Sequence, residues 1–201
     1  MSKRPNRKIE RGEATRGQLV AIARRLFARH GYDGTSIEAV LREADVSRGA
    51  LYHHFAGKDA LFTAVLESVE ADIARVIAKA VDGLTDPVAV FRAGCDAWLR
   101  LARDPTVRQI ALIDAPAVVG WAQWRAIDER YAFGLMKGGL QAAAAAGLVR
   151  ADHVDILAHM LLAALAEVAL YIARAKDSKA AIRTGQSAVD ELLDGLFGPA
   201  A

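Results

Sequence analysis

Side chains suited to contact with a nucleic acid gather within twelve consecutive residues. The hydroxyl, imidazole and cationic groups of this stretch belong to Ser47, Arg48, Tyr52, His53, His54 and Lys58. An arginine can donate two parallel hydrogen bonds to guanine O6 and N7, so Arg48 is a candidate for reading a base. Hydroxyl, imidazole and ammonium groups reach phosphate oxygens, which position a protein on the duplex. Gly49 and Ala50 are small and would let a helix approach the base edges.

Two short helices separated by a tight turn are expected to position these side chains. Thr35 and Glu38 have the spacing of a capping box, which predicts the start of the first helix. The apolar face of this helix follows helical spacing at Ile37, Val40, Leu41 and Ala44. Ser47 is a suitable N-cap for a second helix that ends near His54. Two helices joined in this way form a helix-turn-helix, whose second helix enters the DNA major groove.

The run from Ser47 to Leu61 resembles the DNA-binding signature of the tetracycline-repressor (TetR) family. Its spacing, Gly-x-Leu-Tyr-x-His-Phe-x-x-Lys-Asp-x-Leu, begins at Gly49, and the resemblance covers residues 14–66 by motif. It implies phosphate contacts for Ser36, Tyr52, His54 and Lys58, and base-facing positions for Arg48, Gly49, Ala50 and His53. With the two residues at the starts of the helices included, the predicted DNA-binding set is Thr35, Ser36, Ser47, Arg48, Gly49, Ala50, Tyr52, His53, His54 and Lys58.

Two residues depart from the pattern of the family. Asp45 stands in the turn where the family usually has glycine. Asp tolerates a left-handed backbone better than most residues, so a small strain is expected rather than a lost motif. Leu41 stands where the family usually has a small alanine, which predicts a slightly different crossing of the two helices.

The distribution of charge also favours a nucleic-acid partner. Residues 1–58 contain twelve Lys or Arg and six Asp or Glu, which gives a net charge of +6, whereas residues 59–201 contain fourteen and eighteen, which gives −4. Positive charge concentrated at one end of a chain is typical of a nucleic-acid reader. Residues 1–13 are predicted to form a basic flexible arm. Such an arm either enters the minor groove or contributes only general attraction to DNA, and the sequence leaves both readings open.

Composition limits the class of protein further. The chain has 201 residues, of which 53% are hydrophobic and 25% charged, enough apolar side chains for one or two compact domains. There is no uncharged apolar run of about 18 residues, so no membrane span is predicted, and no signal peptide is recognised. The single cysteine, Cys95, has no partner for an internal disulfide and fits a cytoplasmic protein. Catalytic, phosphate-binding and zinc-binding patterns are not found, so no enzymatic activity, metal or cofactor is predicted.

Helical spacing predicts an all-α protein of about nine helices, because no segment alternates as a strand does. Residues 14–58 are expected to form a three-helix DNA-binding domain. Residues 59–198 are expected to form a larger helical domain for ligand binding and dimerisation, and a helix over residues 58–81 links the two. The remaining helices are predicted at residues 87–103, 106–113, 117–146, 153–176 and 179–196.

The last two helices are predicted to form the interface of a homodimer. Between Ile156 and Ala173 nearly every residue is apolar, so a helix here must be covered on all sides. In a small protein a second subunit is the expected cover, and two helices from each subunit make a four-helix bundle. Burial within one subunit is the alternative. A twofold dimer would present two recognition helices about 34 Å apart, the spacing of successive major grooves.

A large apolar domain attached to a DNA reader suggests that the protein senses a small, largely apolar molecule. Polar atoms and aromatic rings in an apolar helical domain are candidates to line its pocket, although helix packing or the second subunit would also satisfy them. The predicted pocket residues are Trp98, Trp121, Trp124, Tyr131, His159, Glu167 and Tyr171.

The leading interpretation is a ligand-responsive transcriptional regulator that represses from a palindromic double-stranded operator. Two other hypotheses stay open at this point. One is a DNA-binding regulator without a ligand, whose C-terminal domain only dimerises. The other is an enzyme built on the helical domain, for which the sequence shows no catalytic set.

Overall fold

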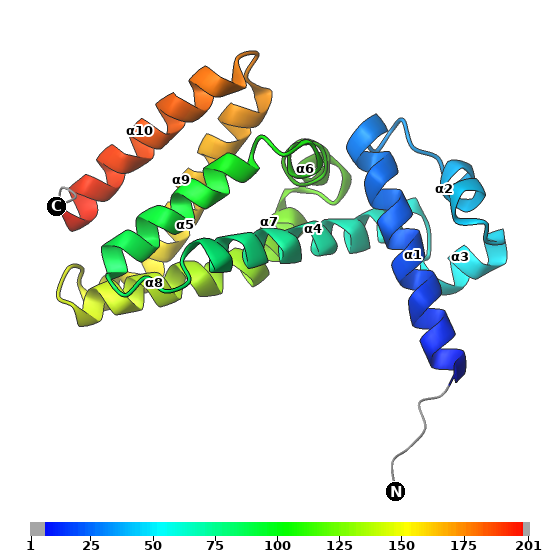
Figure 1. Ribbon diagram of the computed structural model, residues 1–201, viewed down its shortest axis with the longest axis horizontal. Coiled ribbons are helices and arrows are strands. Elements are labelled where there is room, and N and C mark those ends of the chain that lie inside the picture. Colours follow the sequence, from blue (N-terminus) through cyan, green and yellow to red (C-terminus); the bar gives the residue numbers. More distant parts are fainter. Residues whose placement is uncertain (1–6, 199–201) are drawn as a thin grey trace, which may run out of the picture.

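The computed structural model describes residues 7–198, and the side chains of residues 12–198. Over this range the helical elements join into nine continuous segments, and there is no strand. This confirms the predicted all-α fold. A small three-helix head stands at one end of an elongated molecule, and a larger helical domain forms the other end (Figure 1).

The head consists of three helices around one apolar core. They are α1 (Arg7–His30), α2 (Ile37–Ala44) and α3 (Arg48–His54). Leu19, Phe27 and Leu51 are fully buried in this core. Helix α1 begins at Arg7, so the prediction of a flexible arm over residues 1–13 is wrong for residues 7–13, which are helical. Residues 1–6 of the predicted arm lie outside the described residues.

The turn between α2 and α3 has the predicted left-handed residue. Asp45 adopts φ 52° and ψ 45°, and its N–H donates to the carbonyl of Leu41. Ser47 caps α3, since its hydroxyl accepts a hydrogen bond from the N–H of Ala50 at 3.2 Å. Both features are set by local sequence, because Asp tolerates this conformation and Ser is a favoured N-cap.

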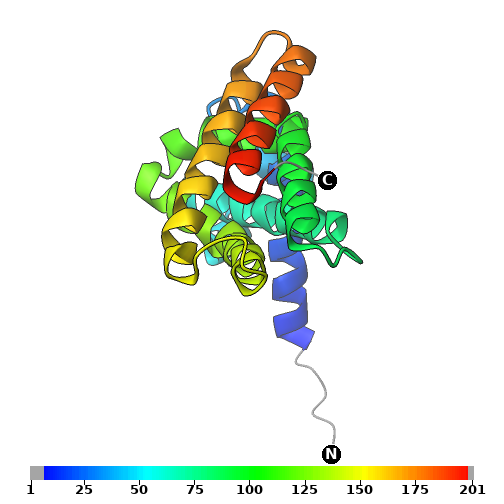
Figure 2. The same cartoon turned by 90° about the vertical axis from the view of Figure 1, so that its left-hand side faces the viewer.

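Helix α4 (Lys58–Ala80) leaves the head and runs through the larger domain (Figure 1). The other elements of that domain pack against α4 or against one another. These are α5 (Pro87–Leu101), the π-helix η1 (Val107–Asp114), α6 (Ala115–Val118), α7 (Trp121–Asp128), the π-helix η2 (Glu129–Phe133), α8 (Gly134–Ala145), the short η3 (Ala151–His153), α9 (Val154–Arg174) and α10 (Ser178–Phe197). Helices α9 and α10 lie side by side at the end far from the head (Figure 2).

The predicted boundary between the helices 106–113 and 117–146 is wrong. The first continues to Val118, because η1 is a π-helix and the N–H of Ala115 donates to the carbonyl of Ile110. Pro116 lies in the first turn of α6, directly after η1, and does not end the helix. The helix breaks at Gly120, which has a φ of 79°, a conformation that glycine adopts without strain.

Helix α9 is the most apolar element of the larger domain. Its length and hydropathy alone would allow it to cross a membrane, but half of its most apolar window is buried inside the protein. One side of α9 packs on α8 and α10. The opposite side carries Ile156, Met160 and Tyr171, all of which are exposed in the single chain.

Candidate nucleic-acid interface and internal pocket

Helix α3 presents a polar face outward from the head. Its apolar side chain Leu51 is fully buried and anchors the helix to the core. Five of the predicted DNA-binding residues on or beside this helix are exposed, namely Ser47, Arg48, Gly49, Tyr52 and His53. Ala50, His54 and Lys58 are partly buried, and a Cβ added at Gly12 would lie 3.8 Å from the His54 ring, so His54 sits against α1. This face has the groups that a major groove and its phosphates require.

The start of α2 differs from the prediction by one residue. Thr35 is only 2% exposed, and its hydroxyl donates to the carbonyl of Gly31 at 2.9 Å. Its side chain is therefore buried and hydrogen-bonded to the backbone at the end of α1. The prediction that it caps α2 and contacts DNA is wrong. Ser36 is the N-cap instead, accepting from the N–H of Ala39 at 3.1 Å, and it remains exposed.

Two cations of the head are held in place by neighbouring side chains. The Arg48 guanidinium lies 2.6 Å from Glu38, and the Lys58 ammonium lies 3.9 Å from the centre of the Tyr32 ring. A backbone hydrogen bond and then the pairing with Arg48 lower the pKa of Glu38. Burial, followed by the hydrogen bond to Asp59, raises the pKa of Tyr32 to about 12, so its hydroxyl stays protonated. Exposed pairs such as Arg48–Glu38 contribute little to the stability of the fold.

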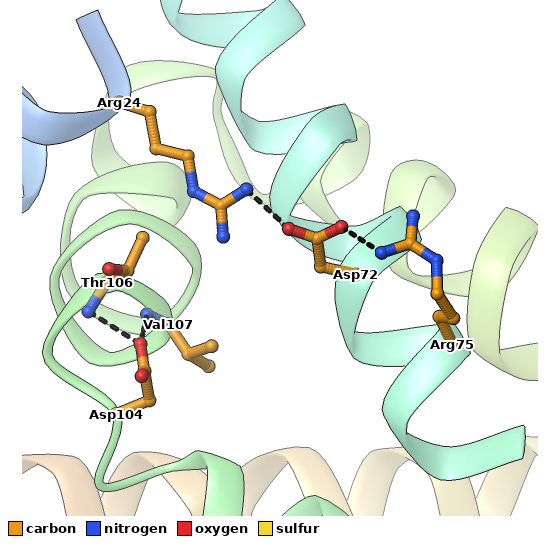
Figure 3. Close-up of polar contacts among 6 residues, drawn as sticks. All are labelled: Arg24, Asp72, Arg75, Asp104, Thr106 and Val107. Carbon is orange, nitrogen blue, oxygen red and sulfur yellow. Dashed lines mark hydrogen bonds and ion pairs between the residues drawn. The ribbon is translucent and has the colours of Figure 1, made fainter. Parts of the chain in front are cut away.

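Polar contacts at Asp72 and at Asp114 help to tie the head to the larger domain. Arg24 of α1 and Asp72 of α4 form an ion pair at 2.5 Å, and Arg75 bonds the other oxygen of Asp72 at 2.7 Å (Figure 3). These ion pairs lower the pKa of Asp72 against the opposing effect of burial. At the end of η1, Asp114 accepts from the N–H of Tyr32 at 2.8 Å and from Gln109 at 2.9 Å. Both α4 and η1 are therefore bonded directly to the head.

Asp104 fixes the other end of η1. Its carboxylate accepts hydrogen bonds from the N–H groups of Thr106 at 2.8 Å and Val107 at 3.1 Å (Figure 3). These bonds satisfy backbone donors at the start of the helix that have no partner within it. Both ends of η1 are thus held by aspartates, Asp104 at the start and Asp114 at the end that faces the head.

An internal pocket of about 280 Å³ lies among α4, α5, α8 and α9. Its wall is mainly apolar, with aromatic rings from Phe91, Trp98 and Tyr131. Helix α8 contributes Gly134, Gly138 and Gly139, and a Cβ at Gly139 would come within 3.0 Å of the Phe91 ring. Cys95 also lines the pocket, and burial raises the pKa of its thiol to about 12, so it is not a thiolate at neutral pH.

Only Trp98 and Tyr131 of the predicted pocket residues line this pocket. The prediction is wrong for the other five. Trp124 is buried in contact with Trp121, which is itself exposed. His159, Glu167 and Tyr171 are exposed on the outer side of α9, because the side of α9 that faces the pocket carries Leu162, Leu165 and Ala166.

Two buried carboxyl groups in the pocket wall were not predicted. Glu70 of α4 is 3% exposed, and its carboxyl group has no hydrogen-bond partner among the described residues. Burial, and then the charge of Asp128, raise the pKa of Glu70 to about 8. Burial raises the pKa of Asp128 to about 6, against the opposing charge of Arg125, whose guanidinium lies 3.0 Å away. The sequence did contain a signal, since Glu70 falls one turn after Leu66 on the apolar face of its helix.

No group of three or more His, Cys, Asp or Glu side chains within the described range is placed to hold a metal ion. The fold and the exposed face of α3 together define a helix-turn-helix DNA-binding regulator with a second helical domain. Residues 19–65 match the family model for bacterial regulatory proteins of the tetR family, and residues 88–196 match the tetracyclin repressor-like C-terminal domain. The chain belongs to the TetR family of transcriptional regulators.

Individual relatives agree with this assignment. A TetR-family transcriptional regulator from Pectobacterium atrosepticum has a crystal structure that is 33% identical, covers 96% of this chain and 98% of its own, and gives a TM-score of 0.85. The transcriptional repressor AcnR of Corynebacterium diphtheriae is 39% identical over 64 residues, which is 32% of this chain and only 34% of AcnR. The structure of AibR with isovaleryl coenzyme A and operator DNA shares the fold, with a TM-score of 0.61 and 20% identity over 92% of this chain and all of its own.

Proposed function

We propose that this protein is a homodimeric transcriptional repressor that leaves a palindromic operator when a small molecule occupies the internal pocket. The observation that carries the proposal is the course of α4. One helix begins with Lys58 beside the recognition helix and carries Glu70 into the pocket wall. The same helix is fixed to α1 through Asp72. A regulator of this kind would act in the cytoplasm, where its operator is.

The mechanism follows from these ties. A ligand that fits the pocket only when α4 has shifted favours the shifted state, and the shift is passed through Arg24 and Asp114 to the head. The two recognition helices of a dimer then no longer match successive major grooves. A 100-fold preference of the ligand for the shifted state supplies about 2.7 kcal/mol.

The experiment that tests the proposal measures release of DNA. The operator is first selected from a pool of genomic fragments, and binding is followed by fluorescence anisotropy while small molecules are added. A molecule that releases operator DNA from the wild-type protein, but not from a variant whose pocket is filled by Gly138→Leu, supports the proposal. Operator binding that no pocket ligand changes would favour the alternative in which the C-terminal domain only dimerises.

Replacing Arg48 with alanine is expected to lower affinity for the operator by about 1–3 kcal/mol and to leave affinity for random DNA nearly unchanged. The reason is that the guanidinium meets its matching base in the operator, whereas a random duplex usually presents a different base pair at that position. Lys58→Ala is the matched control, and it should weaken binding to all sequences and reduce the log–log salt slope by about one unit per head. Equal losses on operator and random DNA for Arg48→Ala would contradict the role assigned to Arg48.

The outer side of α9 is the proposed dimer interface, together with α10. It exposes large apolar side chains, of which Met160 is 60% exposed in the single chain. Exposed apolar patches of this kind mark interaction surfaces. Glu167 and Tyr171 lie on the same side of α9 and would meet the second subunit.

Met160→Glu is expected to weaken the dimer by at least about tenfold, because an unpaired carboxylate would be buried in an apolar interface. Sedimentation velocity over a range of protein concentrations measures this change. Val76→Glu is the matched control, since Val76 is 45% exposed on α4, outside the proposed interface. A dimer that tolerates Met160→Glu as well as it tolerates Val76→Glu would exclude this side of α9.

A further inference from the structure

We propose that the internal pocket binds a small lipophilic cation, such as an amine with an apolar or aromatic body, whose charge pairs with the carboxylate of Glu70. This inference rests on the proposed ligand response and names the chemical class of the ligand. It is carried by the position of Glu70, the charges around it and the composition of the pocket wall.

Glu70 is the first part of the argument. Its carboxyl group is buried, lines the pocket and has no hydrogen-bond partner among the described residues. A buried polar group without a partner destabilises a protein, so such groups are rare away from functional sites. The side chain is therefore placed where a ligand can supply the missing partner.

The surrounding charges favour a positive partner over a neutral or negative one. No described residue that lines the pocket is Lys, Arg or His. Asp128 is a second carboxyl group in the wall, and the Arg125 behind it is shared with Glu129, at 3.0 Å and 3.7 Å. Arg125 is therefore already paired with the carboxylates of Asp128 and Glu129 while Glu70 is still protonated. An anionic ligand would meet repulsion from Asp128 without compensation, whereas a cation would compensate both Asp128 and the charge that Glu70 gains when it loses its proton.

The wall also suits the rest of such a ligand. Trp98, Tyr131 and Phe91 supply aromatic rings, and rings attract cations through their faces. The indole N–H of Trp98 is already bonded to the carbonyl of Leu165 at 3.2 Å, so this side chain offers the ligand its ring surface and no donor. A volume of about 280 Å³ suits a small amine with an apolar or aromatic body.

Pairing with a cation must release a proton at neutral pH. The pKa of Glu70 is about 8, so the empty pocket holds a neutral carboxyl group at pH 7. The other titratable groups of the wall are Asp128, Cys95 and Tyr131, and burial raises the pKa of Asp128 to about 6 and that of Cys95 to about 12. The bound cation favours the carboxylate, and the proton leaves to solvent. Affinity for a cation should therefore rise with pH and level off above about pH 8.

Three probes with one carbon skeleton test the inference, namely phenylbutylamine, phenylbutanol and phenylbutanoate. Isothermal titration calorimetry with the full-length protein gives their affinities at about pH 7, and two buffers of different ionisation enthalpy give the proton release. The variants are Glu70→Gln and, as matched control, Glu67→Gln. Glu67 lies on the same helix, pairs with Arg130 at 2.8 Å and does not line the pocket.

The amine is expected to bind at least about tenfold tighter than the alcohol and to release close to one proton. Glu70→Gln should weaken amine binding by about 30-fold or more and abolish the proton release, while alcohol binding stays within about threefold. Glu67→Gln should behave as the wild type. A preference for the alcohol or the carboxylate, absence of binding by all three probes, or amine binding without proton release would overturn the inference.

The operator assay separates this outcome from failure of the proposed function. If a neutral molecule releases operator DNA while the amine does not bind, the ligand class is wrong and the ligand-responsive regulator stands. If the protein binds no operator at all, the proposed function fails whatever the calorimetry shows.

Discussion

At about pH 9 the Glu70→Gln variant is expected to be more stable than the wild-type protein by about 3–5 kcal/mol. At about pH 5 the two proteins should agree to within about 1 kcal/mol. Glutamine has nearly the shape of the protonated glutamic acid and keeps a neutral group in the pocket wall. The variant therefore removes only the free energy of placing a negative charge there.

The dependence on pH follows from the two states of the chain. In the unfolded chain Glu70 loses its proton near pH 4.5, whereas burial and the charge of Asp128 hold the proton to about pH 8 in the folded protein. Between these values the unfolded chain is ionised and the folded protein is not, so wild-type stability falls relative to the variant by about 1.4 kcal/mol per pH unit. Above about pH 8 both states are ionised and the difference is constant.

Urea denaturation of both proteins at several pH values, followed by far-ultraviolet circular dichroism, measures this difference. Asp128 is present in both proteins, so its own titration largely cancels in the comparison. The Glu67→Gln variant is the matched control, because Glu67 is partly exposed, paired with Arg130 and outside the pocket. Parallel stability curves for wild type and Glu70→Gln would show that Glu70 is not held neutral by burial.

Loss of the Phe62 ring is expected to destabilise the protein by about 3–5 kcal/mol when alanine replaces it. Phe62 of α4 is fully buried and packs edge-on against Phe27 of α1, with ring centres 5.2 Å apart, and against Tyr32, at 5.3 Å. These three rings join the head to α4. The alanine variant leaves a cavity at this joint, and the lost contacts add to the lost burial of the ring.

Phe62→Leu is the matched control, since it keeps most of the apolar volume and should lose distinctly less stability. Chemical denaturation gives the free energies of unfolding of both variants. Operator binding, measured at a temperature where both are folded, tests whether the Phe62 contact between the head and α4 affects DNA binding. If the cluster couples the two parts, Phe62→Ala should weaken operator binding beyond the effect of Phe62→Leu. A loss of stability below about 1 kcal/mol would show that the rings do not form a core at this place.

Local chemistry made the head predictable from sequence. The left-handed turn at Asp45 and the cap at Ser47 depend on residues within a few positions of each other, and both predictions are confirmed. The start of α2 was misplaced because Thr35 and Ser36 are both good caps. The choice between them depends on the carbonyl of Gly31, which binds the Thr35 hydroxyl and is fixed by the way α1 ends.

The pocket depends on contacts that sequence spacing does not contain. His159, Glu167 and Tyr171 share one side of α9, as their spacing indicates. Whether this side faces the pocket or solvent depends on how α9 packs against α8 and α10. Glu70 and Asp128 are 58 positions apart, and the fold brings them to one wall. Its place on an apolar helix face marked Glu70 as unusual, but only the structure shows that its carboxyl group has no partner among the described residues.

Glu70 and Asp72 are two residues apart on α4, so their side chains leave the helix at an angle of about 200° to each other. One faces the pocket and the other is bonded to α1. Under the proposed mechanism, a ligand in the pocket and the bond to α1 would be separated only by the thickness of one helix, about 10 Å. If the proposed mechanism holds, a rotation of α4 by a few degrees would move both side chains at once, and substitutions that uncouple ligand binding from DNA binding should concentrate on this helix and its direct neighbours.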